Sequence, residues 1–229
     1  MDLGLAQSHR DAQDGPAAIG QDSHGRQHGH ADPHFGKAQH FRGAGVPVPA
    51  GTTRRNLERL GVALDQTRAT RLVVLGDFFH ARGGVTPDLL KQLAAWRGAR
   101  PDLEVVNVRG NHDRHAGDPP PEVARPVAGP WRDPAEPAVA FAHEPCAIDG
   151  VATLCGHVHP AVRLAGPAKS RLRAPCFWFN DQTGVLPAFG AFTGMKAVRP
   201  RRGERVFAVG PDRVIEVPAA PARGRARVG

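Results

Sequence analysis

Short apolar segments followed by glycine-containing polar motifs are the feature that most limits how this chain folds. Residues 71–75 (RLVVL) lead directly into Gly76-Asp77, and residues 103–108 (LEVVNV) are followed closely by Gly110-Asn111-His112-Asp113. Between them, Thr86-Pro87-Asp88 has the cap residue and first-turn proline of a helix start. Successive β-α-β units of this kind form a parallel sheet, and α/β proteins bind ligands in the loops at its carboxyl edge.

Helical patterns stop after residue 116, where a proline-rich loop is expected over 116–137. Seven short segments bounded by Gly, Pro or Asp follow, each typical of a strand. They cover residues 138–143, 151–155, 162–164, 175–179, 184–186, 205–209 and 213–217. Together with a helix capped by Thr52 or Thr53 and ending near Gln66, this order predicts a mixed α/β domain. We expect a pair of sheets that carries helices on its outer faces.

Composition disfavours several other classes. At 229 residues, 41% of them hydrophobic, the chain is long enough for one full core. No apolar run reaches the roughly 20 residues that span a bilayer, and no signal sequence follows Met1. The three cysteines form no CxxC pair, which argues against a disulfide scaffold or a thiolate zinc site. We expect one cytoplasmic domain that does not associate with a membrane.

Basic charge is concentrated towards the C-terminus. The net charge is +8, and the segment from Arg199 to Gly229 holds eight arginines against three acidic residues, which is +5 of that total. A basic end favours a polyanionic partner such as nucleic acid. Arginine used simply as a solubilising residue explains the same pattern equally well, so charge alone leaves both interpretations open.

Five motifs hold the residue types of a metal site. In chain order they are Asp32-Pro33-His34, Gly76-Asp77, Gly110-Asn111-His112-Asp113, His143 and Gly156-His157-Val158-His159. Carboxylate, amide and imidazole ligands without thiolate suit divalent ions such as Mn²⁺, Fe²⁺ or Zn²⁺. A single Asp or His after a strand is usually a turn or cap residue. The complete ordered set is therefore what indicates a site.

In this order the motifs resemble the signature of the calcineurin-like metallophosphoesterase superfamily. The resemblance implies a metallophosphoesterase β-sandwich flanked by helices, an active site at the carboxyl ends of strands, and two adjacent metal ions that lower the pKa of a bridging water. It assigns Asp32, His34 and His159 to the first ion, Asn111, His143 and His157 to the second, and Asp77 to both.

The same resemblance implies catalytic roles for two further residues. His112 would protonate the leaving oxygen or stabilise its charge, and Asp113 would orient the His112 imidazole. Asp113 as a simple helix cap is the alternative. Residues near the motifs that are candidates for contacts with ligands or substrate phosphates are His80, Lys37, Arg42, Arg114 and Arg173. Phe177-Trp178-Phe179 is a candidate base-stacking face, although buried packing is the better interpretation of both phenylalanines.

Longer segments are similar to one bacterial branch, the ligase-associated DNA damage response endonucleases. They are residues 31–38, 41–42, 45–49, 143–145, 156–160 and 186–194, and the resemblance extends over about residues 31–209. It implies a Mn²⁺-dependent phosphodiesterase that cuts within single-stranded DNA during DNA repair. It also implies a functional association with a DNA ligase, a helicase and an exonuclease. A phosphatase or pyrophosphatase on nucleotides or small phosphate esters shares the same ligands and stays open.

The N-terminal segment departs from this family. Residues 25–30 (GRQHGH) stand where the family has an apolar strand, and Pro33 stands where it has leucine. A polar, glycine-interrupted segment is a poor central strand. We therefore expect residues 1–30 to be disordered, or not native to the family through a reading-frame error or a wrong start, and Asp32 and His34 to be loosely held. The domain would then cover 31–217, with a basic tail at 218–229; a metal-impaired nucleic-acid-binding scaffold is the corresponding alternative function.

Overall fold

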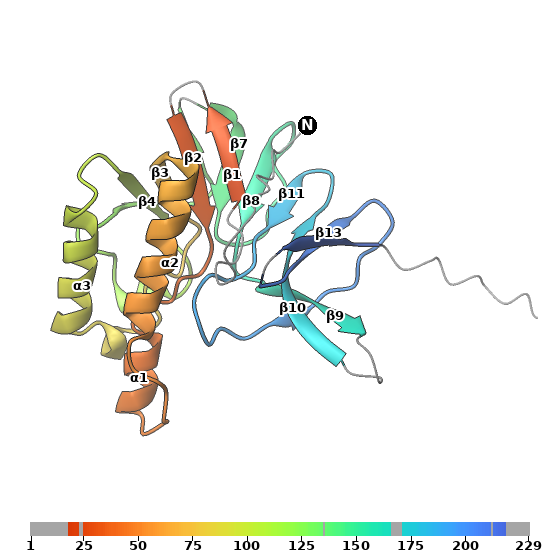
Figure 1. The fold of residues 1–229 in the computed structure, drawn as a ribbon. Coiled ribbons are helices and arrows are strands. Elements are labelled where there is room, and N and C mark those ends of the chain that lie inside the picture. The colour runs from red at the N-terminus through yellow and green to blue at the C-terminus, as the bar shows by residue number, and fades with distance from the viewer. Residues whose placement is uncertain (1–17, 23–24, 135, 166–170, 212, 219–229) are drawn as a thin grey trace, which may run out of the picture.

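The computed structural model describes residues 18–22, 25–134, 136–165, 171–211 and 213–218, which form two packed β-sheets with helices on one side (Figure 1). The first sheet has five strands in the order β1-β2-β3-β4-β5. Their bounds are β1 Ala18–Asp22, β2 Gly25–His30, β3 Ala69–Val74, β4 Glu104–Val108 and β5 Arg125–Val127. Strands β2 to β5 are parallel, so their carboxyl ends meet at one edge.

The second sheet has nine strands in the order β12-β9-β10-β11-β8-β7-β6, with β13 paired to β10 and β14 paired to β13. Their bounds are β6 Trp131–Asp133, β7 Glu136–Ala142, β8 Ala152–Cys155, β9 Pro160–Ala165, β10 Arg171–Phe179, β11 Thr183–Val185, β12 Lys196–Ala197, β13 Arg205–Val209 and β14 Val214–Val217. Strands β7, β8 and β11 are parallel to one another. All seven predicted strands are confirmed, but the predicted loop over 116–137 is wrong because it contains β5, β6 and the start of β7.

The helices are α1 Lys37–Gly43, α2 Thr52–Thr67, the 3-10 turn η1 Arg82–Gly84, α3 Pro87–Gly98 and α4 Asp113–Ala116. Figure 1 shows α2 and α3 on the outer side of the first sheet. The start of α3 is confirmed, since Thr86 Oγ1 accepts from the Leu89 amide at 3.2 Å. The start of α2 is confirmed, but its cap is Gly51 rather than a threonine side chain. Helix α1 was not predicted.

The position of β3 between two cores explains why residues 72–75 form a continuous apolar run. Leu72 and Val74 pack with the leucines of α2 and α3 in one core. Val73 and the adjacent Leu75 face the other way and pack against the second sheet with Phe177. A strand that is buried on both faces has no solvent-exposed face, so its sequence does not alternate between apolar and polar residues. The predicted β-sandwich is confirmed. Within the described residues, its helices cover the outer side of the first sheet (Figure 1).

Residues 25–30, expected to be disordered, form strand β2 between β1 and β3. The side chains of Gln27, His28 and His30 are at most 7% exposed. His28 Nε2 and His30 Nε2 lie 2.8 Å apart, and Gln27 Nε2 donates to Asp133 Oδ2 at 3.0 Å. The expectation of disorder is therefore wrong for these residues, because each of the three buried side chains has a polar atom with a partner inside the protein. Whether they are native to the family stays a prediction.

Two further expectations lie outside the described residues: the order of residues 1–17 and that of the basic tail beyond residue 218. In the described part of the chain, no helix combines the length and the apolar character needed to cross a membrane.

Candidate metal centre

The loops that follow β2, β3, β4, β7 and β8 converge at one edge of the sandwich and bring all seven predicted metal ligands together. Asp32 and His34 follow β2, Asp77 follows β3, Asn111 follows β4, His143 follows β7, and His157 and His159 follow β8. These loops come from both sheets, so the cluster sits at the mouth of the sandwich rather than on either sheet alone.

The first predicted ligand set forms a compact group. Ligand atoms of Asp32, His34 and His159 all lie within 4.8 Å of one another. Three buried atoms here, Asp32 Oδ1, His34 Nδ1 and His159 Nε2, have no hydrogen-bond partner among the described residues. Buried polar atoms are normally paired. Buried oxygen and nitrogen atoms without partners, in one compact group of carboxylate and imidazole side chains, are what a divalent ion satisfies, so the residues fit a metal.

The second set is equally close. Asn111 Oδ1 lies 2.8 Å from His143 Nε2 and 3.1 Å from His157 Nδ1. The Asp77 carboxylate lies between the two sets, with Oδ1 at 3.5 Å from His143 Nε2 and Oδ2 at 3.8 Å from His34 Nε2. This is the position that a carboxylate shared by two ions would take. Burial is the largest influence on the pKa of the Asp77 carboxyl and raises it.

Backbone strain is concentrated on these ligands. Among the described residues, positive φ angles occur at seven non-glycine positions, and five are predicted ligands. The five are Asp32 (52°), His34 (45°), Asp77 (50°), His157 (64°) and His159 (50°). Each such conformation costs about 1–3 kcal/mol and persists only where the surroundings enforce it, typically at functional sites. The strain turns each side chain back over the strand ends.

Backbone hydrogen bonds and glycines hold the loops in this arrangement. The amide of His157 donates to Asp32 Oδ2, and the amide of His112 donates to Asp77 Oδ1, both at 2.9 Å. A Cβ on Gly156 would approach Asp32 Oδ2 to 2.6 Å. The glycine before this ligand pair is therefore required because a side chain would displace the carboxylate.

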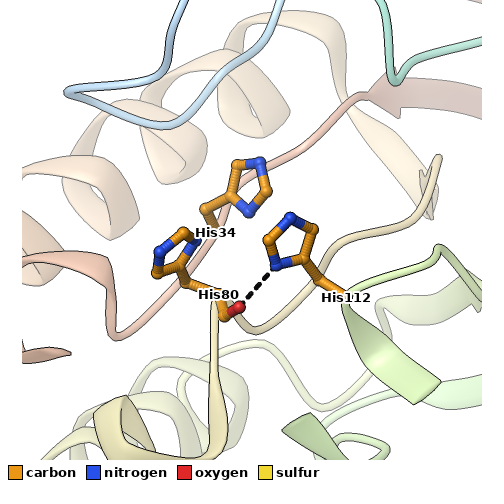
Figure 2. A group of neighbouring side chains, drawn as sticks. All are labelled: His34, His80 and His112. Atoms are coloured by element: carbon orange, nitrogen blue, oxygen red, sulfur yellow. Dashed lines mark hydrogen bonds between the residues drawn. The ribbon is translucent and has the colours of Figure 1, made fainter. Parts of the chain in front are cut away.

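Three histidine rings form a further group (Figure 2), and two of them, His34 and His112, lie 3.8 and 3.9 Å from the Asp77 carboxylate. His34, His80 and His112 have nitrogen atoms within 4.8 Å of one another. His112 Nδ1 lies 2.6 Å from the His80 carbonyl oxygen, and the two rings stack with centroids 5.1 Å apart. Because a carbonyl only accepts, Nδ1 carries a proton and donates it. Nε2 then remains for chemistry, 3.9 Å from Asp77 Oδ2.

Asp113 does not orient His112 as expected. Its buried carboxylate accepts from the Gly110 amide at 2.9 Å, from the Phe79 amide at 3.3 Å and from Asn107 Nδ2 at 3.3 Å. The contact at His112 Nδ1 comes instead from the backbone of His80. Asp113 thus joins the loops that follow β3 and β4, and burial raises its pKa. A backbone contact of this kind has no sequence signature, so motif reading missed it.

The candidate phosphate contacts divide into two groups. Lys37 is half-buried at the start of α1. Burial is the main cause that lowers the pKa of His34 and of His80, and the nearby charge of Lys37 lowers both further, so Lys37 lies beside the cluster. Arg42 donates to the carbonyls of Val48 and Pro49, which places it in a loop contact. Arg42 is exposed, as are Arg114 on α4 and Arg173 on β10.

The expected base-stacking face is largely buried. Phe177 is 1% exposed and packs between the sheets, as interpreted from the sequence. Phe179 packs against the same core, and Trp178 is half-buried against two smaller clusters.

Pseudomonas putida nuclease MPE has 34% sequence identity to the chain, with a TM-score of 0.72 over 92% of this chain and 100% of that one. YfcE, a phosphoesterase from E. coli, has 15% identity and a TM-score of 0.41 over 83% and 97%, a likeness too weak to carry an argument. No protein-family model and no curated protein matches the chain. The identity to nuclease MPE over its whole length shows that the chain belongs to the metallophosphoesterase family, as a metal-dependent phosphoester hydrolase.

Proposed function

We propose that the chain is a two-metal phosphodiesterase that cuts within single-stranded DNA, with Mn²⁺ as its ion and DNA repair as its role. The observation that carries the proposal is the convergence of the seven predicted ligands on one cluster, in which three buried oxygen and nitrogen atoms have no hydrogen-bond partner among the described residues. The similarity to a nuclease supports the choice of a nucleic-acid substrate. Nitrogen and oxygen donors suit Mn²⁺, although Fe²⁺ and Zn²⁺ share this preference.

Each ligand has a defined place in this proposal. The first ion would be held by Asp32, His34 and His159, the second by Asn111, His143 and His157, with Asp77 shared between them. Two such ions supply charge neutralisation at a phosphodiester and a bound water of lowered pKa. The strained backbone and the interloop hydrogen bonds keep the ligands oriented before substrate arrives, which removes a reorganisation step from catalysis.

His112 would act as the general acid. Its Nδ1 proton is engaged by the His80 carbonyl, so proton transfer to a leaving oxygen has to occur at Nε2, on the side of the shared carboxylate. Asp113 contributes as a positioning residue by fixing the Gly110 amide within the same motif. Lys37, beside the cluster, would contact a substrate phosphate.

The test is cleavage of a circular single-stranded DNA with Mn²⁺, with a duplex circle as the control substrate. Linearisation by the wild type is expected, with loss in Asn111→Ala and in His112→Ala. His115→Ala is the matched control, because His115 is an exposed histidine three residues along on α4 and cutting should be unchanged. Linearisation by Asn111→Ala at the wild-type rate would contradict the proposal.

Nucleotides or small phosphate esters are the second candidate substrate class, because they require the same ligands. Hydrolysis of a small phosphodiester without any cutting of the circle would assign the chain to that class. The complete ligand set disfavours a metal-impaired scaffold. Association with a DNA ligase, a helicase and an exonuclease, and a cytoplasmic location, belong to the same proposal and rest on the resemblance of the sequence to the ligase-associated branch.

A further inference from the structure

The segment over residues 186–194 follows β11 and is tied to the metal ligands at two points. The amide of Gly190 donates to the Asp32 carbonyl at 3.2 Å. Further along, the Gly194 carbonyl lies 3.0 Å from His159 Nδ1 and fixes that ring. Thr193 Oγ1 donates to the Gly190 carbonyl at 2.9 Å and closes the turn between the two points. The segment is therefore built against the ligands of the first ion.

Phe192 lies at the middle of this turn, and both its exposure and its backbone conformation are unusual for a large aromatic residue. Its side chain is 53% exposed, and its backbone has a φ of 62°. A bulky aromatic residue in the left-handed region is strained, and its ring gains little from burial at this exposure. Glycine would remove the strain at no loss to the core. Strain without a packing benefit points to a function for the side chain.

The position of Phe192 relates it to the phosphodiester site. It lies two residues from Gly190 and two from Gly194, and consecutive Cα atoms are about 3.8 Å apart, so its Cα is within about 8 Å of both tether points. Lys196, exposed on β12, follows four residues later, and its amide donates to the His159 carbonyl at 3.0 Å. An exposed aromatic ring and an exposed cation on the same short segment are the pattern that binds a single nucleic-acid strand through base stacking and phosphate contact.

We propose that Phe192 is a stacking platform for one base of a single strand, next to the phosphodiester held at the metal cluster. This inference rests on the proposed function and specifies how the strand is held. A base–aromatic stack tolerates any base, because every base has a π-face. The platform therefore orients the strand without selecting its sequence, and a paired base in a duplex cannot reach it.

The test measures binding of a 2-aminopurine-labelled single-stranded oligonucleotide in a His112→Ala background, which retains all seven ligands. Stacking on Phe192 quenches the fluorophore. Phe192→Ala is expected to abolish the quenching and weaken binding about 5- to 150-fold, the range of one base–aromatic stack. Phe192→Trp should retain both. Leu172→Ala is the matched control, since Leu172 is an apolar residue 63% exposed on β10, and it should change neither.

A second variant checks the backbone argument. Phe192→Gly should raise the thermal unfolding midpoint, because glycine adopts this φ without strain, and should weaken oligonucleotide binding as much as Phe192→Ala. Equal quenching and affinity in Phe192→Ala and its parent would overturn the platform, and wild-type linearisation of the circle would then still support the nuclease. If quenching depends on Phe192 but the wild type does not linearise the circle, the stacking role of Phe192 is supported and the proposed nuclease activity is contradicted. No oligonucleotide binding by any variant would overturn both.

Discussion

Strands β2 and β3 lie side by side in one parallel sheet and feed ligands to the same edge, but their sequences have opposite character. Strand β3 (ATRLVV) buries apolar side chains on both faces, whereas β2 (GRQHGH) buries Gln27, His28 and His30. Both are equally part of the sheet. The comparison shows that pairing with neighbouring backbones is enough to build a central strand when its polar side chains meet partners inside.

The two strands are not equally stable supports. Each large apolar side chain buried by β3 contributes about 1.5–3 kcal/mol. In β2, His28 Nδ1 is buried without a hydrogen-bond partner in the described structure, and burial lowers the pKa of His28 to about 4. An unpaired buried nitrogen costs about 1–3 kcal/mol. The first ligand pair therefore rests on a strand that gains less from burial than its neighbour.

Hydrogen bonds between loops compensate for this difference. The His34 amide donates to the Asp77 carbonyl at 2.9 Å, and the Leu75 amide donates to the His30 carbonyl at 2.7 Å. Asp32 is also held from the second sheet by the His157 amide. The expectation that Asp32 and His34 are loosely held is wrong, since both are at most 4% exposed and fixed from β3 and β8.

The largest effect is expected from Asp77→Ala, because this carboxylate follows the apolar strand β3 and lies between the two predicted ligand sets. Phosphodiester hydrolysis with Mn²⁺ should fall by about 10³-fold or more. Initial rates on an oligonucleotide and on a small phosphodiester measure the loss. A decrease below tenfold on both substrates would show that Asp77 does not serve both ligand sets.

Asp113→Asn should have the next largest effect, and it tests the connection between the loops that follow the apolar strands β3 and β4. The variant keeps the shape of the side chain but replaces one acceptor oxygen, so the loops after β3 and β4 lose part of their connection. A loss of about 10–100-fold in activity is expected, as for groups that orient metal ligands. Activity with saturating Mn²⁺ is the measurement, and an unchanged rate would reduce Asp113 to a helix cap.

The polar strand should make folding stability depend on pH. The folded-state pKa of His28 is about 4, below its ordinary value of 6.5, so the unfolded chain takes up the proton first as pH falls. The contribution of His28 to the free energy of unfolding is fully present above pH 6.5. It decreases as the pH falls to about 4, by about 3 kcal/mol in total.

His28→Val should remove this contribution and raise the free energy of unfolding at pH 5. Urea unfolding at pH 7 and pH 5 measures the difference. His115→Ala, at an exposed histidine, is the control and should retain the wild-type pH dependence. Identical pH dependence in His28→Val and the wild type would contradict the account of β2.

The smallest effect is expected from Arg42→Ala. The guanidinium is exposed and donates to two loop carbonyls rather than to the cluster. The change should alter kcat/KM by less than about threefold and stability by about 0.5 kcal/mol or less. A tenfold increase in KM for an oligonucleotide would instead place Arg42 against the strand.

The same contrast explains what the sequence could predict. Strands β3 and β4 follow from apolar runs, and the convergence of the predicted ligands on one cluster agrees with the resemblance of the motif order to the metallophosphoesterases. Strand β2 could not be predicted, because Gln27 finds its partner in Asp133, 106 residues away. The support of His112 was missed for a related reason, since it comes from the backbone oxygen of His80 and any residue type supplies that oxygen.

The most direct test of the two-metal site counts bound Mn²⁺ ions by calorimetric titration of the wild type, Asp32→Ala and Asn111→Ala. Two ions per chain are expected in the wild type. One is expected in each variant, because Asp32 after β2 and Asn111 after β4 would serve different ions. A single ion in the wild type, or two ions retained in Asp32→Ala, would contradict the account.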